Sequence, residues 1–250
     1  MGEIFAILLP VMLLMSRIGA LLMVLPIFGW RTIPIPVKIA MTLAVTGCFA
    51  VVVPMPPITA DLHWVSGVLL MVKEILLGVA LGLAVTLVYR GVQQGAAIAA
   101  RQMGFADAGI GDPAFDESAY PVELLLEMVF IVFFLANDGH HLLLMVIARS
   151  YDAFPVGQMP HVGLLAEAVL QAGSTMLLFA LQLSGPLLAA FLVLGVLLGV
   201  IARVLPELNI MMLSLPLRVA LGIFLASLLV PYLGGFAFRL AEWMHHLLPV

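Results

Sequence analysis

The sequence has little charge and almost no cysteine. Only 10% of its 250 residues are charged, and the formal net charge is −4, whereas soluble domains are about 25% charged. So sparse a supply of charges excludes a soluble enzyme, and ten basic residues spread over the chain cannot form a nucleic-acid-binding face. The single cysteine, Cys48, excludes an intrachain disulfide. Disorder is excluded because it requires low hydrophobicity and high net charge.

The chain is instead rich in apolar residues. Hydrophobic residues make up 64% of it, and the mean hydropathy is +1.23. These values predict an integral membrane protein built from helices. Glu3 is the only charged residue before Arg17, so the basic region of a signal peptide is missing and the first apolar segment is expected to stay in the mature protein.

Prolines and polar turns divide the chain into apolar segments that we expect to be helical. The last two segments form a hairpin, with kinks expected at Pro186, Pro216 and Pro231. The fold class predicted is therefore an all-α membrane protein with long kinked helical hairpins. The segments run over about residues 4–28, 39–53, 64–103, 122–147 (interrupted at 137–141), 164–205 and 210–248, with loops at 104–121 and 150–160.

The third segment is too long for one membrane crossing. About 40 residues of helix span roughly 60 Å, while the hydrocarbon core is about 30 Å thick. The segment therefore either breaks near Gly91 or projects beyond the lipid, packed on other protein. Its second half carries the polar residues Arg90, Gln93, Gln94, Arg101 and Gln102.

Pairs of glycines spaced four residues apart predict close helix packing, because small residues let helix backbones approach each other in lipid. The pairs are Gly78/Gly82, Gly91/Gly95 and Gly195/Gly199. Some of these contacts are expected to involve other chains.

Arg17, Lys73 and Glu74 are charges inside apolar runs. A charge at the centre of a membrane helix costs about 2.5–3.5 kcal/mol, so each needs a partner or water. Lys73 and Glu74 are adjacent and point about 100° apart, so we expect them to meet different neighbours. An ion or proton relay stays possible, but pairing between helices or subunits is favoured because only Glu127 joins Glu74 as a central acid.

The sequence contains no nucleophile elbow, phosphate-binding loop or zinc signature. His140 and His141 are adjacent, whereas helical metal ligands prefer spacings of three or four residues. Asp138 is expected to cap the helix that follows. We therefore expect no catalytic residue, no metal and no cofactor.

Three stretches in register resemble the FliR family, flagellar biosynthetic proteins that are export-gate subunits of type III secretion. The resemblance covers essentially the whole chain. The stretches are residues 102–106 followed by Asp112-Pro113, residues 138–143 followed by Ser150 and Pro155, and residues 203–209 followed by residues 216–218.

The resemblance implies a division into a FliP-like helical part, residues 1–163, and a FliQ-like helical hairpin, residues 164–250. It implies one copy of the chain in a hetero-oligomeric gate with FliP and FliQ, associated with FlhB. It further implies the bacterial inner membrane and the flagellar basal body as location, with a projection to the periplasmic side.

The resemblance also implies which residues matter. By position, the 104–121 loop is the candidate plug of the closed channel. Arg203 and Glu207, in the third stretch, join the three central charges as candidates for buried or intersubunit pairing. The plug candidates are Gly104, Phe105, Ile110, Pro113 and Phe115.

The function implied is that of a non-enzymatic subunit of the channel through which unfolded flagellar proteins cross the inner membrane. An export gate of a virulence type III system is the alternative. A small-solute secondary transporter is disfavoured because the two halves of the chain lack matching broken helices and a midplane ion site.

Overall fold

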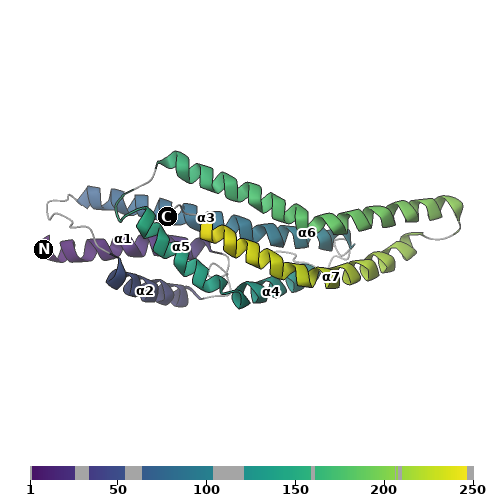
Figure 1. Cartoon of the computed structure of the whole chain (residues 1–250), viewed down its shortest axis with the longest axis horizontal. Helices are drawn as coiled ribbons and strands as arrows, with labels where there is room; N and C mark the ends of the chain where they lie inside the picture. Colours follow the sequence, from purple (N-terminus) through teal and green to yellow (C-terminus); the bar gives the residue numbers. More distant parts are fainter. Residues whose placement is uncertain are drawn as a thin grey trace. The chain divides into compact units, whose positions relative to one another are not determined.

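The computed structural model describes residues 2–25, 34–53, 64–103, 121–158, 161–205, 207 and 210–246. All regular secondary structure in these ranges is α-helical (Figure 1), which confirms the predicted fold class. The helices are α1 (Gly2–Val24), α2 (Ile35–Val52), α3 (Trp64–Gln102), α4 (Pro121–Ala136), α5 (Gly139–Ala153), α6 (Val162–Val204) and α7 (Ile210–His246).

Two predicted boundaries are wrong, and one alternative that the sequence left open is decided. Helix α2 begins at Ile35 rather than at residue 39, because a proline in the first turn removes an N–H that has no partner within the helix anyway. Helix α5 continues to Ala153 rather than to residue 147, so the loop that follows it is shorter than predicted. Helix α3 is one helix from Trp64 to Gln102, so of the two alternatives for the third segment the break near Gly91 does not occur.

Among the described residues, the four helices α2, α3, α6 and α7 are long and apolar enough to cross a membrane, and the α4–α5 pair would make a fifth span if counted as one. Helices α3, α6 and α7 contain 39, 43 and 37 residues. Each therefore spans roughly 55–65 Å, well beyond the ~30 Å hydrocarbon core. The prolines at 186, 216 and 231 lie inside helices and do not end them.

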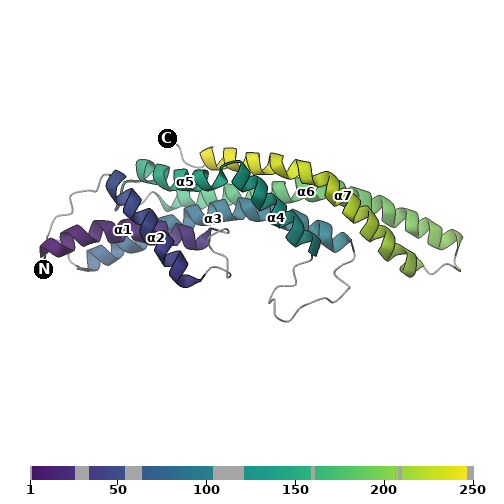
Figure 2. The same cartoon turned by 90° about the horizontal axis from the view of Figure 1, so that it is seen from below.

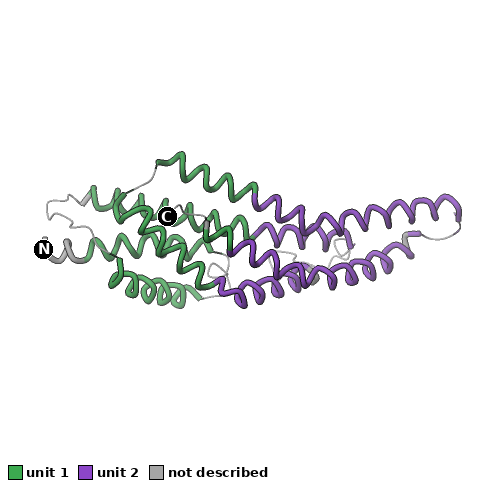
Figure 3. The backbone as a smooth tube through the Cα atoms, in the orientation of Figure 1, with its two compact units in different colours: residues 1–89, 140–174, 242–250 green, residues 90–139, 175–241 purple. Residues whose placement is uncertain are grey.

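The chain folds into two compact units, coloured separately in Figure 3. Unit 1 comprises Met1–Tyr89, His140–Ser174 and Glu242–Val250, and unit 2 comprises Arg90–Gly139 and Thr175–Ala241. Helices α3, α6 and α7 each contribute to both units. Each unit combines segments that are far apart in the sequence. The predicted division into a FliP-like part, residues 1–163, and a FliQ-like hairpin, residues 164–250, instead cuts the sequence once. The units do not test it, and it stays a prediction.

In unit 1, helix α1 lies beside α2 and α3, as both cartoon views show (Figures 1 and 2). The contact with α3 is close, because a Cβ atom placed on Gly82 would lie 3.0 Å from the Leu21 carbonyl oxygen. Helix α2 instead buries only Thr42 and Thr46. The hydroxyl groups of both threonines donate to carbonyl oxygens of their own helix, those of Lys38 and Thr42.

In unit 2, the second half of α3 packs tightly against α6. A Cβ atom on Gly91 would lie 2.6 Å from the Met176 carbonyl oxygen, and one on Gly95 would lie 3.0 Å from that of Ala180. Near the end of α3, Met103 is fully buried and fills the notch left by a glycine, Gly222 of α7. The surrounding apolar cluster consists of Ala99, Met103, Leu187, Phe191 and Ala226.

The predicted close approach at two of the glycine pairs, 78/82 and 91/95, is thus confirmed within the chain. The third pair differs: among the described residues, no heavy atom outside the local helix lies within 4 Å of a Cβ placed on Gly195 or Gly199.

Candidate functional site

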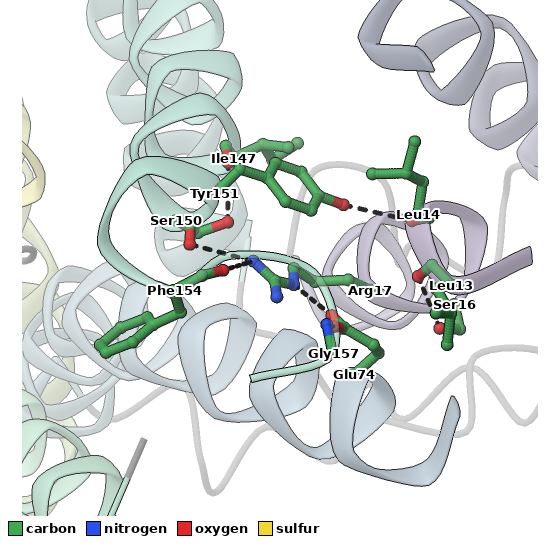
Figure 4. Close-up of polar contacts among 10 residues, drawn as sticks. All are labelled: Leu13, Leu14, Ser16, Arg17, Glu74, Ile147, Ser150, Tyr151, Phe154 and Gly157. Carbon is green, nitrogen blue, oxygen red and sulfur yellow. Dashed lines mark hydrogen bonds and ion pairs between the residues drawn. The ribbon is translucent and has the colours of Figure 1, made fainter. Parts of the chain in front are cut away.

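A buried ion pair joins the first and third helices. The Arg17 Nε atom of α1 donates to Glu74 Oε2 of α3 at 2.5 Å, and the two side chains are 1% and 2% exposed (Figure 4). Two of the three charges found in apolar runs therefore lie together in unit 1. Glycine at position 78 makes this possible, because a Cβ there would collide with the Arg17 carbonyl oxygen and push the two helices apart.

The Arg17 guanidinium also hydrogen-bonds to the C-terminal end of α5. Its Nη1 atom donates to the carbonyl oxygens of Ser150 and Phe154, each at 2.9 Å (Figure 4). The last carbonyls of a helix lack intrahelical partners and carry the negative end of the helix dipole. A cation placed there stabilises the helix end, so Arg17 connects α5 to α1 and α3.

A turn after α5 supplies the second partner of the carboxylate. The Gly157 N–H donates to Glu74 Oε1 at 2.7 Å. Gly157 has a φ of 86°, a conformation that glycine adopts at little cost. The Gln158 N–H closes this turn on the Pro155 carbonyl oxygen at 3.0 Å. Both oxygens of Glu74 thus accept a hydrogen bond from the protein.

The aromatic ring of Tyr151 also contacts the Arg17 guanidinium. The Arg17 Cζ atom lies 4.3 Å from the ring centroid of Tyr151, a favourable cation–π distance. The Tyr151 hydroxyl donates to the Leu14 carbonyl oxygen of α1 at 3.3 Å. Arg17 Nη2 is buried without a hydrogen-bond partner in the described part of the chain. The groups that contact the Arg17 guanidinium in this site all belong to unit 1.

This arrangement favours a structural cross-link over a proton relay. A relay needs an acid that can exchange its proton with a neighbour, but Glu74 is bonded at both oxygens and its ion-pair partner does not deprotonate in proteins. The bonds join segments 57, 133 and 137 residues apart in sequence. Removing one member of such a buried pair typically costs about 3–5 kcal/mol.

The other predicted charges are not among the contacts of this ion pair. Lys73 is half-buried, and Arg203 and Glu207 are exposed in this chain. The structure therefore brings Arg17 and Glu74 together, and the roles of the other three stay predictions. The plug candidates Gly104, Phe105, Ile110, Pro113 and Phe115 lie outside the described residues.

Sequence reasoning missed the partners of the pair on and after α5. Tyr151 and the carbonyl oxygens of Ser150 and Phe154 carry no charge that would mark them in a sequence. Only the Pro155–Gly157 turn gave a signal, since proline and glycine in close succession indicate a turn.

Unit 2 contains a smaller polar contact on α6 and α7. The exposed side chain of Arg239 donates to Gln182 Oε1 at 2.9 Å. Its Cζ atom lies 4.1 Å from the ring centroid of Phe236 and 5.5 Å from that of Phe179. Two aromatic rings and an amide oxygen thus accommodate the Arg239 cation on this mostly apolar part of unit 2.

Residues 8–243 match the model of a protein family described as bacterial export proteins, family 1. The chain is 31% identical over 232 residues to flagellar biosynthetic protein FliR of Pectobacterium carotovorum subsp. carotovorum, covering 93% of this chain and 88% of that protein. It is 32% identical over 216 residues to FliR of Bacillus subtilis (strain 168), covering 84% and 82%. It is 31% identical over 156 residues to Yop proteins translocation protein T of Yersinia pestis, covering 62% and 60%.

Proposed function

Because the chain belongs to the family of bacterial export proteins, family 1, we propose that it is a membrane subunit of a type III protein export gate, in the flagellar system. The observation that carries this proposal is the family match over residues 8–243. The flagellar biosynthetic proteins overlap most of this chain, whereas the virulence-type Yop protein overlaps 62% of it. Helices α2, α3, α6 and α7 supply the membrane-compatible surface that such a subunit requires.

The role we propose is structural rather than enzymatic. The subunit forms part of the wall of the channel through which unfolded flagellar proteins cross the inner membrane. One copy assembles with FliP and FliQ, and FlhB associates with the gate. This proposal is supported by the family resemblance and by the many apolar side chains that the isolated chain leaves exposed, since large exposed apolar surfaces mark contacts with lipid or protein.

The same resemblance supports a finer proposal for the parts of the chain. Residues 1–163 correspond to FliP and residues 164–250 to FliQ, and the gate projects to the periplasmic side of the inner membrane within the flagellar basal body. Helices longer than a bilayer is thick agree with such a projection, because the excess length needs surroundings other than lipid.

We further propose that the 104–121 loop, with Gly104, Phe105, Ile110, Pro113 and Phe115, obstructs the closed channel. This assignment rests on the family resemblance and on sequence position alone. The apolar side chains would supply the obstruction and the glycines the backbone freedom.

The proposed function is tested by deleting the gene from its own bacterium and restoring it. We expect the deletion to abolish secretion of flagellar proteins and the intact chain to restore it. Co-expressed with FliP and FliQ, the chain should purify as a monodisperse complex, while alone it should aggregate. A stable monomer in mild detergent, or a deletion strain that still secretes flagellar proteins, would contradict the proposal. Loss of virulence secretion instead would support the Yop-type alternative.

The plug proposal has its own test. Shortening the loop between Ala106 and Ser118 is expected to leave the complex intact and to make it leak small ions, measured as conductance across a bilayer that holds the purified complex. A shortened loop that stays as tight as the parent would make the segment a simple connector.

A further inference from the structure

The second half of α3, residues 90–102, distributes its side chains in an unusual way. Every exposed residue of this stretch is polar, and every buried one is small or apolar. The exposed residues are Arg90, Gln94, Arg101 and Gln102, and the buried ones are Gly91, Val92, Gly95, Ala96, Ala97, Ala99 and Ala100.

Three of the polar residues lie on one face of the helix. Successive residues rotate by about 100°, so Arg90, Gln94 and Arg101 fall within about 40° of one another over roughly 17 Å of helix length. We call these three residues the polar stripe. In the described part of the chain, neither arginine of the stripe forms an ion pair.

Contacts on both flanks fix the direction of the stripe within unit 2. On one flank, Gly91 and Gly95 touch the backbone of α6. On the other, the Gln93 amide donates to Glu127 Oε2 of α4 at 3.3 Å. The helix cannot rotate about its axis without breaking one of these contacts, so the stripe stays on the free side of α3.

The exposed residues on the other helices of unit 2 are mostly apolar, although Gln182, Arg203 and Arg239 are exposed there as well. The apolar ones include Leu124, Leu125 and Met128 of α4, Leu177 and Leu181 of α6, and Leu228 and Phe238 of α7. Such a surface requires lipid or protein against it. Arginine in hydrocarbon costs about 2.5–3.5 kcal/mol per residue, so the polar stripe needs a polar neighbour, either water or a polar protein surface.

We propose that the polar stripe Arg90–Gln94–Arg101 lines the water-filled path of the export gate, giving it a cationic, hydrogen-bonding wall. The proposal rests on the proposed function, since it presumes that the chain is a gate subunit. Charged side chains facing a pore select what passes by its charge. Guanidinium and amide groups also donate hydrogen bonds to carbonyl oxygens and carboxylates, the acceptors that an unfolded polypeptide offers along its whole length.

The experiment uses single cysteines in the assembled complex. The exposed native Cys48 is first replaced by alanine. Arg90→Cys, Gln94→Cys and Arg101→Cys are then compared with Met128→Cys and Leu181→Cys, which are as exposed in this chain but lie on its apolar surface. The probe is a membrane-impermeant methanethiosulfonate. We expect the stripe positions to react on the order of tenfold faster or more, because a thiol becomes the reactive thiolate where water reaches it.

A second measurement distinguishes the conduit from bulk water. Modification of Gln94→Cys by the bulky probe should slow secretion of a flagellar substrate, while modification at a water-accessible position outside the conduit should not. The Arg90→Glu/Arg101→Glu double variant should shift the permeability of an open complex from anions towards cations.

Two results would overturn the proposal. Stripe cysteines that react as slowly as Leu181→Cys in a complex that still secretes would mean that a partner chain or lipid covers the stripe. Fast reaction that leaves both secretion and ion preference unchanged would mean that the stripe faces bulk water. Failure of the proposed function is recognised separately, because the chain would then neither co-purify with FliP and FliQ nor be needed for secretion.

Discussion

The two halves of helix α3 deal with polar groups in opposite ways. The first half, within unit 1, exposes apolar side chains and buries its only acid, Glu74. The second half, within unit 2, buries glycine and alanine and exposes arginine and glutamine. The exposed apolar residues of the first half are Val65, Val68, Leu69, Val72, Ile75, Leu76, Val79 and Leu83.

The two halves of α3 therefore require different surroundings, apolar for the first half and polar for the second. Glu74 is tolerated in an apolar half because Arg17 and the Gly157 N–H occupy both of its oxygens. Arg90 and Arg101 have no such partners in the described residues, and in the proposal above they face water. One unbroken helix therefore passes from surroundings that exclude charge to surroundings that solvate it.

The largest effect is expected from removing the buried acid. Glu74→Leu leaves the Arg17 guanidinium buried without its counter-charge, at a cost of about 3–5 kcal/mol. We expect the chain to accumulate poorly in membranes and to lose its place in the complex, measured by immunoblot and by co-purification with FliP and FliQ.

The double variant Arg17→Leu/Glu74→Leu is the control for this change. Replacing both members of a buried pair by apolar residues is often close to neutral, so the double variant should recover part of the lost protein. If Glu74→Leu assembles normally and only secretion stops, the pair is a relay and not a cross-link.

A smaller effect is expected from the glycines that hold α3 against α6. Gly91→Ala places a methyl group 2.6 Å from the Met176 carbonyl oxygen, and overpacking of this kind costs about 1–3 kcal/mol. The thermal midpoint of the purified complex should fall, although alanine's better helix propensity of about 1 kcal/mol offsets part of the loss.

Gly199→Ala is the matched substitution on α6, where the described chain has nothing within 4 Å of the new methyl group. As far as contacts within this chain are concerned, the substitution should be neutral or stabilising for the purified complex. A fall in the midpoint of the whole complex would then place a helix of another subunit against Gly199, and equal effects of both substitutions would contradict the difference between the two glycine pairs.

The smallest effect on the chain itself is expected at Lys73. This residue is half-buried, in contrast to its neighbour Glu74, and substitutions away from buried networks usually change stability by less than about 0.5 kcal/mol. Lys73→Leu should therefore leave the amount of membrane-inserted chain unchanged and reduce co-purification of FliP and FliQ, with Lys73→Arg as the control that keeps the charge. Reduced insertion of Lys73→Leu would mean that Lys73 stabilises this chain by itself.

The sequence predicted the helical fold, because it depends on local composition, and it included both members of the buried ion pair among five candidate charges. The cost of charge in lipid marks Arg17 and Glu74 as residues that need partners wherever they lie. Their pairing could not be predicted, since it joins residues 57 positions apart and depends on how α1 and α3 pack. The glycine at 78 indicated that some close contact occurs, but not with which helix.

The end of α5 was mispredicted for a related reason. Local pattern indicated a loop from Ser150, where the chain turns polar, whereas the helix continues to Ala153. The Arg17 guanidinium donates to the carbonyl oxygens of Ser150 and Phe154 at this end, and that contribution comes from a residue more than 130 positions away. Tertiary contacts of this kind leave no trace in the local sequence.

The order of the Arg17 partners along the chain determines when each of them becomes available during synthesis. Glu74 follows Arg17 by 57 residues and Ser150 follows it by 133. At about 5–20 residues per second, the ribosome delivers the counter-charge roughly 3–11 s after the arginine and the carbonyl oxygens roughly 7–27 s after it. The arginine of the nascent first helix is therefore made seconds before its partners, so the contacts that join α1 to α3 and α5 form only after both of those helices have been synthesised.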